Sequence, residues 1–355
     1  MNALALATPL LVDQVTREHP GNELRLLAWN VQKGKRVEEV CEWIVPQRAD
    51  AVLWQEMRPG DLMRVQRLLR MHGYAAVPLP GSRNDNVIFV HEDGVFTVEE
   101  PHEHGWAPWH APAHIEVRLR GAGDDVSRRK LSLVSKHDCS WSSAVRLIEA
   151  DWMTSFARPG YLFIGMGDWN GMPTDAPPIN WSAVKDRAFM VNRTYLTEDG
   201  TRRTDDRADR ILSDVGFVDA ARYVAHDLGR PEALRETAGY GEAGARQAGP
   251  QRIDRTVLSA ELAPAIYVAH DLGRPEALRE TAGYGEAGAR QAGPQRIDRT
   301  VLSAELAPAI KDFTVGDPDP VVDAHLASLS DHRPTRVVLY RDRAAEIMQV
   351  PATGR

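Results

Sequence analysis

Short apolar runs alternate along this chain with segments whose apolar residues recur at helical spacing. The runs predict buried strands, whereas a segment such as 36–47 places Val37, Val40, Cys41, Ile44 and Val45 on one helical face. The expected strands are 24–31, 49–57, 86–94, 113–121, 130–138, 161–170, 251–259 (or its copy 295–303), 312–317 and 333–341, and the expected helices are 36–47, 61–73, 142–160 and 207–224. Strands mixed with helices, some joined by hairpin turns, favour an α/β fold with mixed sheets.

Glycine and proline residues mark several of the expected boundaries. Gly73 stands where a glycine commonly ends a helix, so we expect the helix at 61–73 to end there. The Gly- and Asp-rich segment 121–129 is typical of a turn between two strands. We expect the run at 333–341 to be the last regular element of the chain.

An identical repeat interrupts this pattern near the C-terminus. Residues 223–266 recur without a single change as 267–310. Solenoid repeats diverge and come in three or more copies, so two identical copies indicate a recent tandem duplication, a feature of the expressed sequence or an assembly error. We therefore expect one domain over 23–342 that contains this duplication, with an N-terminal extension at 1–22 and a C-terminal tail at 343–355.

Composition limits the class of protein. The 355 residues are 43% hydrophobic and 26% charged, which is ample for a large core. The net charge of -7 argues against a protein held to nucleic acid mainly by counterion release. Two cysteines provide no disulfide framework, and no apolar stretch approaches the ~20 residues of a membrane span. The start of the chain lacks the pattern of a signal peptide, so we expect a cytoplasmic protein, monomeric by default.

Polar residues of a restricted set follow the apolar runs. Asn30, Glu56, Asp168 with Asn170, and Asp331 with His332 each stand just beyond an apolar, strand-like run. Carboxylate and amide oxygens suit a hard divalent cation, and a histidine can handle a proton near neutral pH. The pattern is that of a metal-dependent phosphoester site, although each residue alone would pass for an ordinary strand-end polar group.

Six short motifs in a fixed order sharpen this interpretation. They are WN at 29–30, QE at 55–56, SKH at 135–137, GDWN at 167–170, RID at 252–254 or 296–298, and SDHRP at 330–334. In these motifs the chain resembles the endonuclease/exonuclease/phosphatase family, which includes deoxyribonuclease I, over about Leu24 to Tyr340. The resemblance implies a four-layered sandwich, in which two facing mixed sheets are flanked by helices, and a site at the strand ends.

The resemblance also implies roles for individual residues. Glu56 corresponds to the principal ligand of Mg²⁺ or Mn²⁺, Asn30 to the amide that orients it, and Asp331 lies near the metal. Asp168 corresponds to the group that orients or deprotonates water. The phosphate contacts would come from Asn170 and His137, and His332 would accept a proton or polarise the phosphate. Asp85 lies where some related nucleases keep an acid that partners His137.

The duplication leaves two candidates for the aspartate that positions His332. Only one RID strand can lie beside the SDHRP segment, so Asp254 and Asp298 compete. Asp298 keeps the shorter connection to the next strand and leaves the extra residues in a loop, where loop expansion costs little free energy. We therefore expect Asp298 to act, with Asp254 as the alternative.

The substrate is less well defined by the sequence. Arg255 and Arg299 replace the aromatic residue usual after RID, which indicates an unusual substrate-facing edge. We expect Arg83, Lys136, Arg146 and Arg333 to be solvated, and Trp106, Trp109 and Trp141 mostly to pack at the core or rim. The leading hypothesis is a nuclease that cleaves DNA or RNA phosphodiesters. The alternatives are a phosphoesterase of small molecules or phospholipid head groups, and a noncatalytic relative impaired by the duplication.

Overall fold

The computed structural model describes residues 23–79, 84–121, 125–259, 262 and 310–349. Two six-stranded sheets form the centre of the fold. The first, sheet A, has the order β13 (Ile310–Val315), β14 (Thr335–Tyr340), β1 (Glu23–Asn30), β2 (Ala51–Met57), β4 (Asp85–Val90) and β3 (His72–Ala75). The second, sheet B, has the order β11 (Val218–Asp219), β12 (Asp254–Leu258), β8 (Leu162–Asp168), β7 (Leu131–His137), β6 (Ala113–Leu119) and β5 (Phe96–His102).

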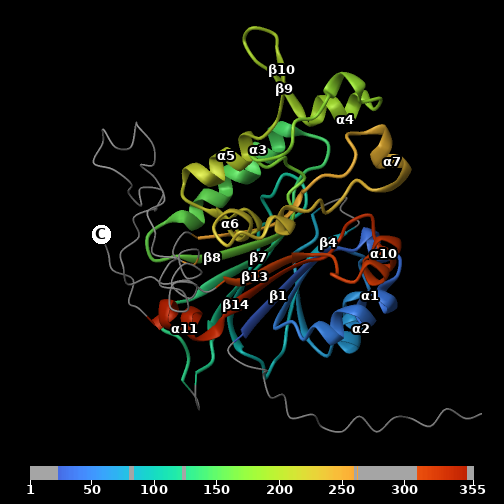
Figure 1. The fold of residues 1–355 in the computed structure, drawn as a ribbon. Helices are drawn as coiled ribbons and strands as arrows, with labels where there is room; N and C mark the ends of the chain where they lie inside the picture. Colours follow the sequence, from blue (N-terminus) through green and yellow to red (C-terminus); the bar gives the residue numbers. More distant parts are fainter. Residues whose placement is uncertain (1–22, 80–83, 122–124, 260–261, 263–309, 350–355) are drawn as a thin grey trace, which may run out of the picture.

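Both sheets are mixed, as the sequence predicted. The pairs β1 with β2 and β7 with β8 are parallel, and the other neighbours are antiparallel. A separate two-stranded hairpin, β9 (Thr194–Leu196) with β10 (Arg202–Thr204), projects from the body of the molecule (Figure 1).

Helices cover the outer face of each sheet and complete four layers (Figure 1). Strand alternation sends Leu26 and Leu53 into the core between the sheets, while Leu27 and Val52 point outward into a second cluster. The helices α1 (Val37–Ile44), α2 (Leu62–Leu69) and α10 (Pro320–Leu329) pack on sheet A, and α3 (Ser143–Met153) and α5 (Arg207–Asp214) pack on sheet B. The expected four-layered sandwich is therefore confirmed.

The remaining helices lie at the margins of the sandwich. They are α4 (Arg187–Asn192), α6 (Ala220–His226), α7 (Gly241–Arg246) and α11 (Arg341–Gln349), with short 3-10 turns at Gln32–Gly34, Val45–Gln47, Thr154–Ala157, Trp181–Ala183 and Pro231–Leu234. α11 contradicts the expectation that 333–341 is the last regular element. Its Ala344, Ile347 and Met348 are buried against the central core, so the chain stays ordered past β14. No helix in the described part of the chain is long and apolar enough to cross a membrane.

Two helix boundaries differ from the prediction. α2 ends at Leu69, where Arg70 takes the left-handed conformation, and Gly73 instead lies in β3. A Cβ at Gly73 would come within 2.7 Å of Leu62 and Phe89, so this glycine permits close packing of the strand. The pattern at 207–224 is broken into α5, β11 and α6, because Gly216 has φ +88 and turns the chain.

The first copy of the duplicated segment builds part of the domain. It supplies most of α6, all of α7 and the whole of β12, whereas 267–309 in the second copy lie outside the described residues. β12 and β13 belong to different sheets, so they do not form the tight connection that the sequence suggested. A connection between strands of different sheets need not be short, so additional residues can be accepted between β12 and β13.

Candidate active site

The predicted site residues gather at one end of the two sheets. Asn30 ends β1, His137 ends β7 and Asp168 ends β8, while Asp254 begins the antiparallel β12. The register places His137 beside Asp168 and Asp168 beside Asp254. Residues distant in the sequence therefore meet because their strands end together.

Asp168 lies at the centre of this group. Its Oδ2 is 3.5 Å from His137 Nε2 and 3.6 Å from His332 Nε2, and it accepts a hydrogen bond of 3.2 Å from Asn30 Nδ2. One ligand atom from each of Asp168, Asp254 and His332 lies within 4.8 Å of the others. Two imidazoles and an amide thus converge on one buried carboxylate.

A glycine makes the position of Asp168 possible. Gly167 has φ +143, and a Cβ there would lie 2.0 Å from the carbonyl oxygen of Lys136. Only glycine lets β8 approach β7 this closely. The missing Cβ of Gly167 also leaves room for the Gln55 side chain. Gln55 donates a hydrogen bond of 2.8 Å to Ser135 Oγ and so links the two sheets.

Glu56 is aimed at the group by an irregularity of β2. The register of β2 with β4 shifts between Trp54 and Met57, and Glu56 takes the left-handed conformation with φ 63. Its Oε1 accepts a hydrogen bond of 3.3 Å from Asn30 Nδ2 and lies 3.9 Å from His137 Nε2. The structure therefore places Asn30 as the link between Glu56 and Asp168.

Asn170 also takes a left-handed conformation, with φ 47, directly after the strand. Its backbone N–H donates to Asp168 Oδ1 at 2.9 Å, and its Nδ2 donates to the Asp138 carbonyl at 3.0 Å. The buried Arg193 donates to Asn170 Oδ1 at 2.6 Å and also to its backbone carbonyl. These bonds fix the orientation of the amide and leave one Nδ2 proton for another acceptor.

His332 is held from both its backbone and its ring. Trp29 Nε1 donates to the His332 carbonyl at 2.9 Å, and Ser330 Oγ accepts from the His332 N–H at 3.1 Å. The ring Nδ1 lies 2.8 Å and 3.0 Å from the two oxygens of Asp254. Burial would lower the pKa of His332, but the carboxylates of Asp254 and Asp168 outweigh it and raise that pKa.

In the described structure Asp254, the alternative copy, makes the contact with His332 that the sequence analysis expected of Asp298. Asp298 lies outside the described residues. The backbone N–H groups of Ile253 and Asp254 donate to Thr237 Oγ1 at 3.1 Å and 2.9 Å, and Thr237 belongs to the same copy. Elements close in the sequence form together at a lower entropic cost, which favours the first copy.

Two other predicted side chains, Asp331 and Asp85, lack the contacts with Glu56 and His137 that the sequence suggested, within the described part of the chain. Asp331 is exposed, and the described contacts do not join it to Glu56. Asp85 pairs with Met57 in the sheet, whereas the described contacts of His137 are with Glu56, Asp168 and His110.

Most of the basic residues expected at the surface are buried instead. Lys136 Nζ lies 2.8 Å from Asp138, Arg146 donates to the Cys139 carbonyl at 2.8 Å, and Arg333 donates to Asp323 at 3.0 Å. Arg255 is also fully buried, with its guanidinium ion-paired to Asp209, so it does not form a substrate-facing edge. Arg83 lies outside the described residues.

Three contributors to the site were not predicted from the sequence. His110 stacks on His137 with ring centroids 4.8 Å apart, Arg193 fixes Asn170, and Thr237 holds the start of β12. His110 follows a tryptophan in a loop, and Arg193 follows a short helix, so neither carries a strand-end signal. Only their contacts identify them.

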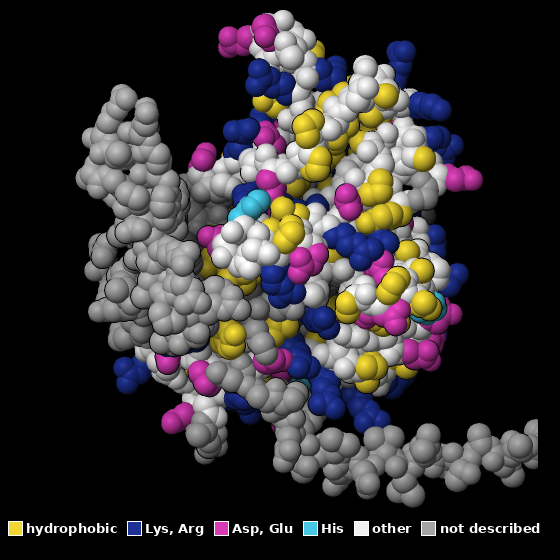
Figure 2. All heavy atoms as spheres, viewed as in Figure 1, with side chains coloured by type: hydrophobic (Ala, Val, Ile, Leu, Met, Phe, Trp, Pro, Cys, Tyr) yellow, Lys and Arg dark blue, Asp and Glu magenta, His cyan; other side chains and the backbone are white. Residues whose placement is uncertain are grey.

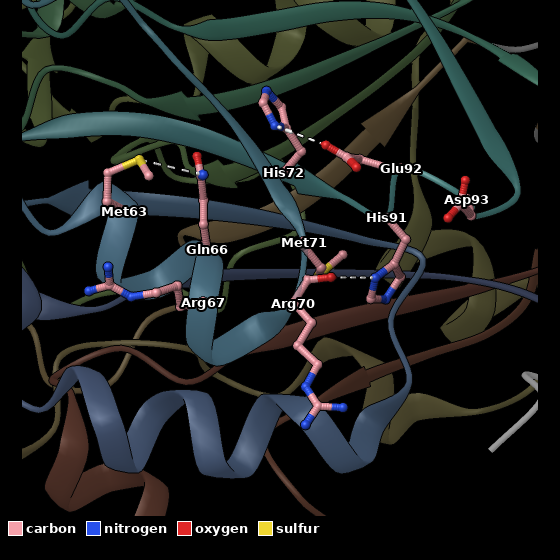
Figure 3. Close-up of a pocket in the computed structure, with 9 residues that line it drawn as sticks. All are labelled: Met63, Gln66, Arg67, Arg70, Met71, His72, His91, Glu92 and Asp93. Carbon is pink, nitrogen blue, oxygen red and sulfur yellow. Dashed lines mark hydrogen bonds and ion pairs between the residues drawn. The ribbon is translucent and has the colours of Figure 1, made fainter. Parts of the chain in front are cut away.

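Two other polar features are separate from this group. A pocket beside β3 and β4 is lined by residues such as Arg67, Arg70 and His91 (Figure 3). The pocket lies near Val90, which pairs with Ala51 at the start of β2. Glu56 lies at the other end of β2, about 17 Å along the strand, so the pocket is separate from the strand-end group.

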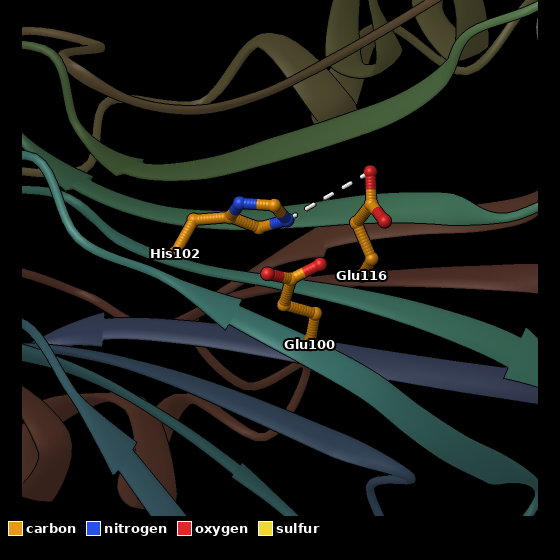
Figure 4. A group of neighbouring side chains, drawn as sticks. All are labelled: Glu100, His102 and Glu116. Carbon is orange, nitrogen blue, oxygen red and sulfur yellow. Dashed lines mark ion pairs between the residues drawn. The ribbon is translucent and has the colours of Figure 1, made fainter.

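The second feature comprises Glu100, His102 and Glu116 on the β5–β6 hairpin (Figure 4). His102 Nε2 lies 3.8 Å from Glu116 Oε1. Lys130 Nζ lies 2.6 Å from the same carboxylate and already compensates its charge. We assign no catalytic role to this group.

Comparison with known proteins identifies the family. A model described as Endonuclease/Exonuclease/phosphatase family matches residues 27–332, which is most of the chain. The chain belongs to this family. Members of the endonuclease/exonuclease/phosphatase family hydrolyse phosphoester bonds. A comparison with curated proteins finds no match for the chain.

The chain is also similar to solved structures at low sequence identity. An endonuclease/exonuclease/phosphatase from Bacteroides vulgatus has 13% identity and a TM-score of 0.51, covering 89% of this chain and 98% of that one. A functionally unknown conserved protein from Enterococcus faecalis V583 has 11% identity and a TM-score of 0.50, covering 88% and 98%. D. rerio TDP2, complexed with a single strand DNA product, has 12% identity and a TM-score of 0.49, covering 89% and 98%.

Proposed function

We propose that this family member is a divalent-cation-dependent phosphodiesterase that acts on nucleic acid. One observation carries the proposal: three carboxylates, Glu56, Asp168 and Asp254, meet two imidazoles, His137 and His332, at one end of the sandwich. Such a group can bind a cation, direct a water molecule and hold the oxygens of a phosphate.

The residues present fit a hard cation such as Mg²⁺ or Mn²⁺. Glu56 and Asp168 offer carboxylate oxygens, the Asn30 amide orients both, and Asp254 adds a further negative charge. Asp254 is already engaged by His332, so Glu56 and Asp168 are the better ligands. We also propose that the exposed Asp331 contributes through a bound water or as a more distant charge. A bound Mg²⁺ or Mn²⁺ would stabilise negative charge on the phosphate oxygens.

The protein side chains divide the remaining tasks. Asp168 accepts a hydrogen bond from the attacking water and orients it, because its Oδ2 faces both imidazoles and is buried. His332, held by Asp254, donates to a phosphate oxygen, as do His137 and the free Nδ2 proton of Asn170. These donors stabilise the charge that builds on phosphorus during in-line attack.

A nucleic-acid substrate must be recognised locally rather than by a broad basic face. On the face shown in Figure 2, basic and acidic side chains are interspersed, in agreement with the net charge of -7. Contacts at the site therefore have to supply the specificity. A phosphoesterase of small molecules or lipid head groups would have the same catalytic group and is the alternative that the experiment must separate.

The test is hydrolysis of a substrate panel by the full chain. We expect single-stranded oligonucleotide and bis-p-nitrophenyl phosphate to be cleaved with Mg²⁺ or Mn²⁺, and EDTA to abolish turnover. Inositol phosphates and phospholipid head groups should react more slowly. Glu56→Gln should lose activity, whereas Glu100→Gln is the matched control because Glu100 is a strand glutamate in the unrelated hairpin group.

Two results would overturn the proposal in different ways. Faster turnover of inositol phosphates or head groups would replace the substrate class and retain the chemistry. Absence of EDTA-sensitive turnover on every substrate, with a folded protein, would favour a noncatalytic relative.

A further inference from the structure

A continuous series of ring contacts leads from the catalytic group to the surface. His110 stacks on His137 at 4.8 Å with an interplanar angle of 18°. Trp109 contacts His110 edge-on at 4.7 Å, and Trp141 contacts Trp109 edge-on at 5.6 Å. These residues come from two loops, one between β5 and β6 and one between β7 and α3, so the contact is tertiary.

The outer end of this series is open, while its inner part is fixed. Trp141 is 53% exposed, although it is a large apolar side chain next to the active site. Trp109 is half-buried, and its indole N–H has no hydrogen-bond partner among the described residues. Packing on both sides therefore holds Trp109 in place, and Trp109 in turn supports the exposed ring of Trp141.

His110, the ring that follows His137 in this series, carries no charge at neutral pH. Burial and the neighbouring His137 lower the pKa of His110 to about 3, against a smaller opposing effect of Asp168. A neutral imidazole stacked on His137 continues the aromatic surface without competing for a phosphate or a cation. The series thus combines a polar end, where a phosphodiester would react, with a flat apolar end.

We infer that the Trp109–Trp141 pair is a stacking subsite for an unpaired nucleobase next to the scissile phosphodiester. This inference rests on the proposed function and specifies its substrate class as single-stranded or frayed nucleic acid. Each base has a π face, so stacking tolerates any sequence but requires that the base is not paired. A lipid head group offers no flat ring that could stack on Trp141, so ring stacking at this position would be specific to a nucleotide.

Trp106 provides a matched control in the same loop. It is 50% exposed, close to the value of Trp141, but it contacts Trp152 at 5.1 Å and His104 at 5.9 Å. Within the described part of the chain, these ring contacts do not join Trp106 to His110 or His137. Loss of an exposed tryptophan in general is therefore distinguishable from loss of the one connected to the site.

The experiment measures binding without turnover, so its failure is separate from failure of the proposed activity. Fluorescence anisotropy in EDTA gives the Kd of a labelled eight-nucleotide oligothymidine and of an abasic strand with the same number of phosphates. We expect wild type to prefer the strand with bases. Trp141→Ala should weaken its binding about five- to a hundredfold and so reduce this preference. Trp141→Phe should retain most of the preference, and Trp106→Ala should leave it unchanged.

Three results would overturn the inference. The first is a wild type that binds both strands equally. The second is a Trp141→Ala variant that keeps the preference for the strand with bases. Equal weakening of the binding of both strands would also count here, because it would indicate an effect on phosphate binding or on the structure. The third is an equal effect of Trp106→Ala, since that ring is not connected to the site.

Discussion

Two groups of three carboxylates, two of them buried in each group, differ in their counter-charges. The strand-end group contains Glu56, Asp168 and Asp254, whose described ion pairs are with the titratable His137 and His332, while Arg193 acts on Asp168 from a greater distance through Asn170. The second group contains Asp175, Asp209 and Asp219, and it is paired with Arg222, Arg252 and Arg255. Three acids face three permanent cations in the second group, whereas the first has an excess of negative charge.

The pKa values of the two groups reflect this difference. Burial alone would raise the pKa of Asp209, but the guanidiniums of Arg255 and Arg222 outweigh it and hold that pKa well below its usual range. Burial raises the pKa of Asp254, and His332 offsets only part of the rise. Because an uncompensated buried charge is costly, the strand-end group is suited to a cation from solution, while the arginine-paired group is complete and structural.

The most severe way to break the strand-end group is Asp168→Asn. The substitution keeps the shape of the side chain and removes the carboxylate that faces both imidazoles. We expect kcat to fall by about 10³- to 10⁴-fold. The melting temperature without metal should stay constant or rise, because repulsion with Asp254 is lost. Steady-state kinetics and a thermal melt test this, and activity within tenfold of wild type would contradict it.

The duplication allows a sharper test with two identical sequence contexts. Asp254→Asn removes the acid that holds His332 Nδ1 at 2.8 Å, so we expect kcat to fall by about 10³-fold. Asp298→Asn changes the corresponding residue of the second copy and should have little effect. The two variants are compared with the same phosphodiester. A loss of turnover in Asp298→Asn alone would restore the original sequence-based preference.

Breaking the arginine-paired group should damage stability rather than chemistry. Asp209→Asn leaves the fully buried Arg255 with a weaker set of counter-charges, so the free energy of unfolding should fall by about 3 kcal/mol. Urea denaturation measures the loss, and kcat per folded molecule should change little. A loss below about 1 kcal/mol would show that this group contributes less than its burial suggests.

The sequence predicted most of the strand-end group but none of the arginine-paired group. Asn30 and Asp168 end the apolar strands β1 and β8, and His332 lies just before β14, so the strands themselves fix where these side chains lie at the edge of a sheet. The arginine-paired group offers no such signal. Asp209 lies in α5, Asp219 at a helix start and Arg252 before β12, and only the tertiary fold brings them together.

The wrong expectations share a physical cause. Lys136 and Arg146 were expected in solvent because charged residues usually are, but each finds partners inside the protein. Asp298 was favoured because β12 and β13 looked closely joined, although they belong to different sheets. Local pattern predicts the elements and their ends, whereas burial of a charge depends on partners from distant elements.

Added metal should distinguish the two groups without changing either. With Mg²⁺ or Mn²⁺ at about 100 times its Kd, we expect the free energy of unfolding of wild type to rise by about 2.7 kcal/mol. The free energy of unfolding of Asp209→Asn is lower without metal but should rise by the same amount when metal is added. That of Glu56→Gln should rise much less. Denaturant titrations at several metal concentrations measure this. Equal gains in wild type and Glu56→Gln would place the cation elsewhere.

The smallest effect concerns a histidine that has no acid beside it. His332 has its pKa raised by carboxylates, but burial and the nearby His102 and His104 lower the pKa of His114 to about 3. The native state therefore keeps His114 neutral where the unfolded chain, with a pKa near 6.5, binds a proton. The contribution of His114 to the free energy of unfolding is therefore fully present above about pH 6.5. As the pH drops towards 3, this contribution falls by about 1.4 kcal/mol per pH unit.

His114→Asn should remove this component of the pH dependence. The side chain is only 6% exposed, so the substitution also changes packing, but that cost is nearly constant with pH and cancels in the slope. His104 remains in the variant, and its lowered pKa contributes to both proteins. Urea denaturation at pH 6, 5 and 4.5 gives the two slopes. Equal slopes would mean that His114 takes up its proton in the folded state, and that a buried imidazole here finds a counter-charge after all.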